Sequence, residues 1–347
     1  MASNKAAWLD AQGASLQVRD APMPKPGPSE IVIQNRAVAI NPLDWHMQDI
    51  GIFVQQWPTI LGCDVAGEVF EVGSDVTRFT KGDRVIAHTI GAVTAKPQDA
   101  AFALYSVAPA AKAAILPAPI SYADGSVLPL ALETAICGLA LQTPGEALPG
   151  VPTPTMGLPY PRLSPIPCGK TIIVHGGSSS VGTMTIQLAV ASGVTVIALA
   201  GSQNLELCRS LGATEAFDYK DPLVLQKVVD VIADKKTFAG IVDAVSTPST
   251  YEQDLQLLSQ IGNGGYLVCS HPPPTEGLPE NVKAGMIFSI NDISQQMWEE
   301  FVTPALQSGQ LKCAPRTLVV GKGLEYIQEA LQSNKAGVSA TKIVVEL

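Results

Sequence analysis

The stretch from Thr171 to Ala200 constrains the fold of this chain more than any other. It begins with a β-branched run of strand length, 171–175, and continues into a turn of small residues, 176–182. An apolar segment suited to a buried helix, 181–191, leads to a second apolar strand, 194–200. The order strand, tight turn, helix, strand predicts one βαβ unit of a doubly wound parallel sheet.

The turn has the residue types that a phosphate ligand requires. Its spacing is Gly176-x-x-Ser179-x-x-Gly182, with Ser179 where the common dinucleotide pattern has a second glycine. Small residues let the backbone approach a pyrophosphate closely, and the N–H groups at the helix start face the ligand with the helix dipole behind them. We therefore predict a nucleotide site at this turn.

The end of the second strand indicates which nucleotide binds. NAD sites usually place an Asp or Glu about 20 residues after the first glycine, where it holds the ribose 2′-hydroxyl. No acid occurs between Gly176 and Leu205, and the strand ends in small and polar residues, 201–204. Tyr219 and Lys220 then offer a phenol and an ammonium group. Because a carboxylate would repel a 2′-phosphate, its absence favours NADP(H).

Composition excludes several classes of function. The chain has 347 residues, 46% of them hydrophobic and 15% charged, which is enough for a large core and, by length, two domains. A net charge of −9 argues against nucleic acid and anionic membrane surfaces as partners. The N-terminus lacks the apolar core of a signal peptide, and no unbroken apolar run reaches membrane-spanning length. We expect a soluble, cytoplasmic protein.

The cysteines and histidines form no readable metal site. Six cysteines are scattered without a C-x-x-C pair, and four histidines are widely spaced. This pattern excludes the usual zinc-ribbon spacing and gives no disulfide framework. We predict no metal.

The remaining chain predicts a second, β-rich domain and further parallel strands. Short strand candidates occur in the first 110 residues at 6–9, 15–19, 30–40, 60–73 and 79–86. A helix is expected over 128–142, later strands over 239–245, 264–270 and 286–290, and a returning segment with a helix at 324–333 and strands at 317–321 and 342–347. The segment 143–169 has eight prolines, so it is an ordered loop, a mobile flap or a surface insertion.

Several motifs, in order, resemble the medium-chain dehydrogenase/reductase superfamily. They are Ala39 to His46, Leu61 to Val69, Val72 to Val76, Lys81 to Val85, Ala101 to Val107, Leu128-Pro129, Thr134-Ala135, the nucleotide turn and Thr341 to Val345. The chain is most similar to the zinc-free quinone-reductase-like branch, and within it to fungal trans-acting enoyl reductases and toxin-biosynthesis oxidoreductases. Zinc-dependent members have a Cys where this chain has Asn41-Pro42, and Gly-His-Glu where it has Gly62-Cys63-Asp64.

The resemblance implies an α/β fold with two domains. A GroES-like β-barrel catalytic domain would comprise 1–130 and 291–347. A Rossmann doubly wound parallel-sheet domain that binds NADP would comprise 131–290, with the Pro-rich insertion at 143–169.

The resemblance also implies the residues of the site. His46 and Thr134 are the expected catalytic residues, His46 as a proton or hydrogen-bond donor and Thr134 as a hydroxyl beside the nicotinamide. A histidine without a role and a threonine bonded to its own helix backbone are the alternatives. The expected cofactor contacts are Leu43, Asp44, Trp45, His46, Ser178, Ser179, Ser180, Val181, Gly201, Ser202, Gln203, Asn204, Tyr219, Ser270, His271, Ala340 and Thr341.

The function that follows from the resemblance is NADPH-dependent reduction of activated carbon–carbon double bonds, of the enoyl reductase type, in fungal secondary metabolism. A general quinone, enone or carbonyl/alcohol oxidoreductase is the alternative within the superfamily. A catalytically silent NADPH-binding protein is the alternative from another class. The expected partner is a small-molecule substrate. A polyketide synthase stays open as a further partner, and the chain is expected to be a monomer or a homodimer.

Overall fold

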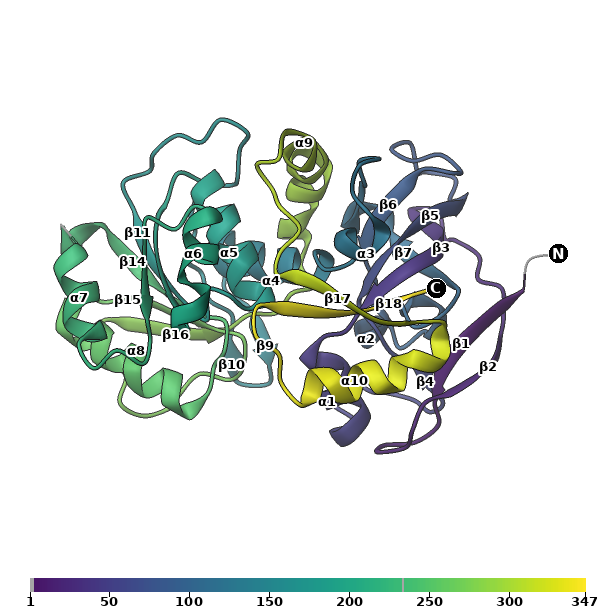
Figure 1. Cartoon of the computed structure of the whole chain (residues 1–347), viewed down its shortest axis with the longest axis horizontal. Coiled ribbons are helices and arrows are strands. Elements are labelled where there is room, and N and C mark those ends of the chain that lie inside the picture. Colours follow the sequence, from purple (N-terminus) through teal and green to yellow (C-terminus); the bar gives the residue numbers. More distant parts are fainter. Residues whose placement is uncertain (1–2, 233) are drawn as a thin grey trace. The chain divides into compact units, whose positions relative to one another are not determined.

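The chain divides into two compact units. The computed structural model describes residues 3–232 and 234–347. The first unit contains the chain up to Leu130 together with Trp298–Gly309 and Cys313–Leu347. The second contains Ala131–Met297 and Gln310–Lys312. Figure 1 labels many of the elements of both.

The first unit is built on β-sheets. A seven-stranded sheet has the order β17-β18-β3-β5-β6-β8, with β7 paired to β3, and a three-stranded sheet has the order β2-β1-β4. All pairs in these two sheets are antiparallel except β17 with β18. The strands are β1 (Asn4–Leu9), β2 (Gln17–Ala21), β3 (Glu30–Ala39), β4 (Thr59–Ile60), β5 (Asp64–Val72), β6 (Arg84–His88), β7 (Tyr105–Pro109), β8 (Ala113–Ile115), β17 (Arg316–Lys322) and β18 (Thr341–Glu346).

Short helices and turns accompany these sheets. The α-helices are α1 (Pro42–Ile50), α2 (Gly91–Thr94), α3 (Tyr122–Gly125), α9 (Val302–Ser308) and α10 (Ile327–Lys335). The 3₁₀ turns are η1 (Pro97–Asp99), η2 (Ala110–Lys112) and η7 (Leu324–Tyr326), and a π-helical turn covers Met297–Phe301.

The pairing of β3 with β5 explains one glycine of the first unit. A Cβ atom at Gly67 would lie 2.2 Å from the carbonyl oxygen of Gln34 on β3. Only glycine lets the two strands approach this closely. Side chains of β1, β3, β5 and β6, among them Leu9, Ile31 and Val65, form the core with residues of α10.

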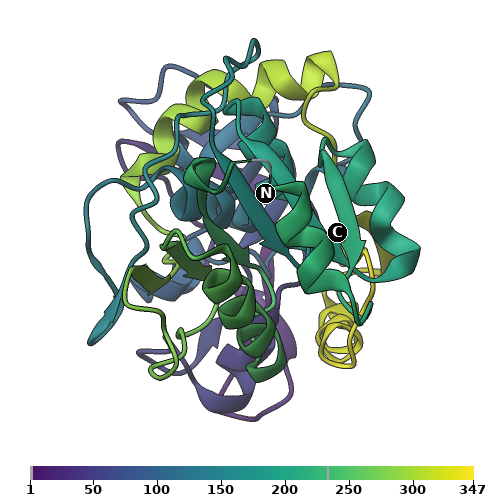
Figure 2. The ribbon, with the colours of Figure 1, turned by 90° about the vertical axis from the view of Figure 1, so that its left-hand side faces the viewer.

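The second unit is a doubly wound α/β domain. Its six strands run in the order β13-β12-β11-β14-β15-β16, and every pair is parallel. The chain order therefore reverses between β11 and β14, where ligands bind in sheets of this kind. Figure 2 shows strands of this sheet running among flanking helices. Its strands are β11 (Thr171–His175), β12 (Thr195–Ala200), β13 (Glu215–Asp218), β14 (Phe238–Asp243), β15 (Gly265–Cys269) and β16 (Val282–Met286).

The helices of this region connect the strands in the expected order. They are α4 (Pro129–Ala140), α5 (Ser180–Ala191), α6 (Leu205–Ser210), α7 (Val224–Val231) and α8 (Pro248–Ile261), with 3₁₀ turns η3 (Ser202–Asn204), η4 (Lys235–Thr237) and η5 (Asp292–Ser294). The predicted α/β fold, a GroES-like unit plus a Rossmann-type parallel sheet, is confirmed.

One local prediction, the place of the last strand of the parallel sheet, differs from the structure. The strand expected over 286–290 is β16, Val282–Met286. Its position is set by pairing with β15, because Met286 lies opposite Cys269, the last residue of that strand. The Pro-rich segment contains a short antiparallel hairpin, β9 (Glu146–Leu148) and β10 (Val151–Pro152), and no helix.

One segment meets the length and composition of a membrane span, which the sequence analysis did not expect. The window lies in Tyr122–Ala140, and 94% of it is buried within the protein. It includes Asp124 and Glu133, so it is not an unbroken apolar run. Such burial is typical of a core helix.

Candidate functional site

The predicted nucleotide turn lies at the carboxyl end of β11 and starts α5. The side chain of Ser179 accepts a hydrogen bond from the Gly182 N–H at 3.0 Å and caps the helix. A Cβ atom at Gly182 would lie 2.1 Å from the carbonyl oxygen of Gly176, so the turn tolerates no side chain there. The hydroxyl of Ser180 is buried and has no hydrogen-bond partner within the described structure. A helix N-terminus with an unused buried hydroxyl fits a phosphate group.

The end of β12 lies beside this turn. The side chain of Asn204 donates a hydrogen bond from Nδ2 to Ser178 Oγ at 3.2 Å. Ser202 and Gln203 are exposed, and Gly201 is half-buried. The structure therefore joins two of the predicted cofactor segments, 178–181 and 201–204, and neither contains a carboxylate.

Tyr219 completes this end of the sheet. The residue is 39% exposed, and the centroid of its ring lies 6.2 Å from that of the His175 imidazole. The ammonium of Lys220 lies 5.7 Å from the centre of the same ring. The phenol of Tyr219 and the ammonium group of Lys220 therefore lie directly after β13, as the sequence predicted.

A buried group of ionisable residues, which the sequence analysis missed, lies under the turn. His175 Nδ1 is 2.8 Å from Asp254 Oδ1, and Asp243 lies opposite His175 in the pairing of β11 with β14. Among the described residues, these three side chains are the one group close enough together to act as ligands of a metal ion. A metal does not fit, because both oxygens of Asp243 already accept hydrogen bonds, from Val245 and Ser246 N–H and from the Thr250 hydroxyl.

Ser270 and His271 follow β15 at the same edge of the sheet. Their side chains lie 3.3 Å apart, from Ser270 Oγ to His271 Nδ1. The Ser270 N–H donates a hydrogen bond to Ser246 Oγ at 2.8 Å. The loops after β14 and β15 are thereby linked.

In the first unit, the start of α1 is tied to a buried ion pair. The Asn41 side chain donates a hydrogen bond to Asp64 Oδ2 at 2.8 Å, and Lys342 Nζ lies 3.1 Å from the same oxygen. Lys342 also donates a hydrogen bond to Asn41 Oδ1, and the Leu130 N–H donates one to Asp64 Oδ1 at 2.6 Å. All the acceptor oxygens of this cluster therefore have partners.

Asp44, predicted to contact the cofactor, lies inside this region. It is fully buried, and its carboxylate accepts a hydrogen bond from the Asn41 N–H at 2.7 Å, which completes a capping box. Burial raises its pKa to about 7, with the charge of Asp64 acting in the same direction. The structure gives Asp44 a capping role in α1.

The other predicted residues of the first unit are more accessible. Leu43, Trp45 and His46 are half-buried on α1. The rings of Trp45 and His46 lie against each other with centroids 3.8 Å apart and a tilt of 35° between their planes. Trp45 Nε1 donates to Asn334 Oδ1 at 3.0 Å. Ala340, with φ +45°, and Thr341 lie at the start of β18.

Thr134 is a buried residue of α4, with 8% of its surface exposed. It belongs to the second unit, whereas His46 belongs to the first. Their joint catalytic role stays a prediction.

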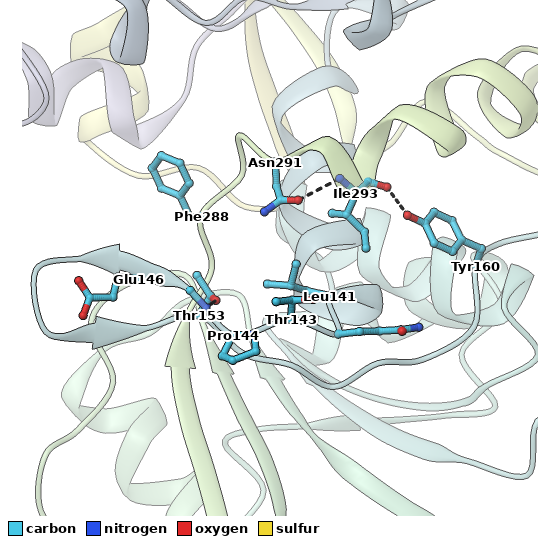
Figure 3. Close-up of a pocket in the computed structure, with 11 residues that line it drawn as sticks. Leu141, Thr143, Pro144, Glu146, Thr153, Tyr160, Phe288, Asn291 and Ile293 are labelled. Atoms are coloured by element: carbon cyan, nitrogen blue, oxygen red, sulfur yellow. Dashed lines mark hydrogen bonds between the residues drawn. The ribbon is translucent and has the colours of Figure 1, made fainter.

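The second unit also contains a pocket beside the Pro-rich segment. It has a volume of about 500 Å³, and Figure 3 shows Glu146, Phe288 and Asn291 among the residues around it. Tyr160 donates a hydrogen bond to the carbonyl of Ile293, and Asn291 Oδ1 accepts one from the Ile293 N–H at 2.9 Å. The Pro-rich segment is thus pinned to the chain after β16, and the pocket has the size of a small-molecule site.

Comparison with known proteins identifies the family. The model of the alcohol dehydrogenase GroES-like domain matches residues 27–118, and that of the zinc-binding dehydrogenase matches 180–283. The chain is 59% identical to the dehydrogenase orsE of Emericella nidulans, over 100% of both chains. It is 38% identical to the trans-enoyl reductase himH of Aspergillus japonicus, over 99% of this chain and 97% of that one.

A solved structure has the same fold. An alcohol dehydrogenase superfamily protein from Novosphingobium aromaticivorans has a TM-score of 0.76 and 22% identity, over 99% of each chain.

The second family model is named for zinc, but the corresponding residues of this chain do not fit the ion. Both oxygens of Asp64 accept hydrogen bonds, and the ammonium of Lys342 stands beside them. Burial, with the charges of Asp44 and Asp64, keeps the pKa of the Cys63 thiol well above its ordinary value. The resemblance found in the sequence is confirmed: the chain belongs to the medium-chain dehydrogenase/reductase superfamily of oxidoreductases.

Proposed function

We propose that the protein is an NADPH-dependent, zinc-independent reductase of activated carbon–carbon double bonds, of the enoyl reductase type, acting in fungal secondary metabolism. The observation that carries the proposal is the phosphate turn of α5 with a rim, 201–204, that has no carboxylate. The likeness to a trans-enoyl reductase supports the choice of a double bond as acceptor. The ion pair of Lys342 with Asp64 supports the absence of zinc.

The residues around the turn would hold the cofactor. The N–H groups of the first turn of α5 and the Ser180 hydroxyl would bind the pyrophosphate. Ser202, Asn204 and Tyr219 would face the 2′-phosphate, with Lys220 as the nearby cation. Leu43, Trp45, His46, Ser270, His271, Ala340 and Thr341 are the remaining proposed contacts.

The proposed reduction requires few ionisable side chains. Bound NADPH supplies the hydride that adds to the β-carbon of the acceptor. A proton must then reach the α-carbon or the enolate oxygen, and His46 is the proposed donor of that proton or of a hydrogen bond. The Thr134 hydroxyl is the proposed second donor to the developing enolate oxygen.

Oxidation of NADPH against a panel of enoyl thioesters, enones, quinones and aldehydes tests the proposal. We expect turnover with the enoyl thioesters and enones. Preference for quinones or aldehydes would favour the general oxidoreductase. Binding of NADPH without turnover of any acceptor would favour the catalytically silent protein. Assays with free thioesters and with a carrier-bound substrate would separate a standalone enzyme from one that serves a polyketide synthase.

A further inference from the structure

The proposed reaction does not use the buried pair of His175 and Asp254. His175 is the last residue of β11 and directly precedes the nucleotide turn. Its Nδ1 lies 2.8 Å from Asp254 Oδ1 on α8, and the two side chains are 3% and 0% exposed. An ion pair this deep is held in one geometry by its surroundings, so it can fix the position of whatever is attached to it.

A second carboxylate extends the pair to the neighbouring strand. Asp243 ends β14 beside His175 and accepts hydrogen bonds from the N–H groups of Val245 and Ser246 at 2.9 and 2.8 Å. It accepts a third from the Thr250 hydroxyl at 2.6 Å, again from α8. Ser246 has φ +57°, a strained conformation for serine, and these bonds hold it there.

The same network reaches the loop after β15. The Ser270 N–H donates to Ser246 Oγ, and that hydroxyl donates to the carbonyl of Asp243. The Ala244 N–H donates to the carbonyl of His175 at 3.0 Å. The ends of β11, β14 and β15 are therefore joined through buried polar groups, and two of these ends carry proposed cofactor contacts.

The buried groups of the network shift one another's pKa values. One imidazole faces two buried carboxylates. Burial raises the pKa of Asp254 to about 7, opposed by the hydrogen bond and charge of His175 and reinforced by Asp243. Burial lowers the pKa of His175, but the hydrogen bond and charge of Asp254 and the charge of Asp243 outweigh it, so the pKa lies above 6.5. Tyr219, with Lys220 on its ring, faces His175 from the loop after β13, and Tyr251 and Cys269 face Asp243 from α8 and β15.

We propose that His175 and Asp254 are positioning residues for the cofactor: their ion pair, extended by Asp243, fixes the phosphate turn and the loops after β14 and β15 in the arrangement that binds NADPH. The inference rests on the proposed cofactor site but not on the identity of the acceptor. Breaking the pair weakens NADPH binding, while the acceptor is still used at saturating NADPH.

The test compares two variants with a control. Asp254→Asn keeps the shape and removes the charge, and His175→Gln keeps a hydrogen-bond donor and removes the cation. Asp230→Asn, on the exposed surface of α7, is the matched control. The dissociation constant for NADPH, from the quenching of tryptophan fluorescence, is expected to rise about tenfold in both variants and to stay within twofold in the control. The KM for the best acceptor should stay within twofold at saturating NADPH.

The pH dependence of NADPH binding separates a positioning role from a merely structural one. It can be measured on the wild-type protein itself. Above pH 7 the 2′-phosphate is already ionised, so its titration does not interfere. As the pH rises through the raised pKa of His175, the imidazole loses its proton, and the dissociation constant of the wild type for NADPH should rise several-fold. Removing Asp254 lowers the pKa of His175, so Asp254→Asn should show a weaker, nearly flat dependence. A flat wild-type profile, or variants that lose thermal stability with unchanged NADPH affinity, would overturn the inference. If the wild type binds NADPH as expected but reduces no acceptor, the proposed function fails and the inference stands.

Discussion

At the scale of single residues, burial decides how a carboxylate behaves. The family resemblance implied that Asp44 contacts the cofactor, and in the structure its side chain is buried and caps α1. The sequence cannot show this, because Asp64 and Lys342, which surround Asp44 with charge, are distant along the chain. The sequence does show the turn that starts α5, because the residues that form it are neighbours.

Asp44 should make the protein less stable as the pH rises. Its pKa is about 7 in the folded state and near 3.8 when unfolded, so the folded state holds an extra proton between these values. The contribution of Asp44 to the free energy of unfolding is fully present below about pH 3.8. It falls as the pH rises through this window, by at most about 1.4 kcal/mol per pH unit. Asp44→Asn keeps an acceptor for the Asn41 N–H and removes the titration. Urea unfolding at several pH values should give a flatter stability profile for the variant. Parallel profiles would contradict the shift.

Ser202 should control the choice between NADPH and NADH. It is exposed at the carboxyl end of β12, where NAD-binding relatives of this fold place an acid. Losing a charged 2′-phosphate contact costs about 1.5–3 kcal/mol, so we expect the wild type to bind NADPH roughly tenfold to a hundredfold more tightly. Ser202→Asp should reverse the preference in fluorescence titrations with both cofactors. Wild-type dissociation constants within twofold of each other would refute the prediction.

At the scale of elements, local patterns were predicted and long-range pairing was not. The unit β11–α5–β12 follows from periodicity and the turn residues within thirty positions. β16 was misplaced because its bounds depend on pairing with Gly265–Cys269, which the sequence does not reveal. The pair of His175 with Asp254 was missed for the same reason, because the two residues are 79 positions apart.

Gly182 should be required for the packing of α5 against the turn. An alanine Cβ would lie 2.1 Å from the Gly176 carbonyl, so the turn must open. Overpacking of this kind costs about 1–3 kcal/mol. We expect Gly182→Ala to lower the thermal midpoint and to weaken NADPH binding at least tenfold. Gly145→Ala is the control, because its Cβ meets only Thr153 Oγ1 at an ordinary 3.5 Å. Unchanged NADPH affinity in Gly182→Ala would contradict a phosphate role for the turn.

At the scale of the whole molecule, the family assignment and the buried polar groups together bear on whether the protein needs zinc. One of the matching models is named for zinc, whereas Asn41, Asp64 and Lys342 satisfy one another through hydrogen bonds and charge. We expect NADPH oxidation to survive exhaustive chelation, with well below one zinc per chain by elemental analysis. Stoichiometric zinc whose removal abolishes activity would show the prediction to be wrong.

The catalytic proposal also belongs to the whole molecule, because His46 and Thr134 lie in different units. If both stabilise the developing enolate, they bind the transition state better than the ground state. A positioned donor in a dry site contributes roughly 2–4 kcal/mol, so Thr134→Val and His46→Ala should each lower kcat by about 10²-fold or more. NADPH affinity should change little, because neither residue is proposed to hold the phosphates.

The two variants should differ in their pH profiles. If His46 donates the proton, His46→Ala loses the dependence of kcat on a group that titrates near neutral pH, whereas Thr134→Val keeps it. A Thr134 with only a structural role would instead show lower thermal stability with kcat intact. If both variants keep kcat near that of the parent on the best acceptor, the proposal fails, and water or the substrate itself must deliver the proton.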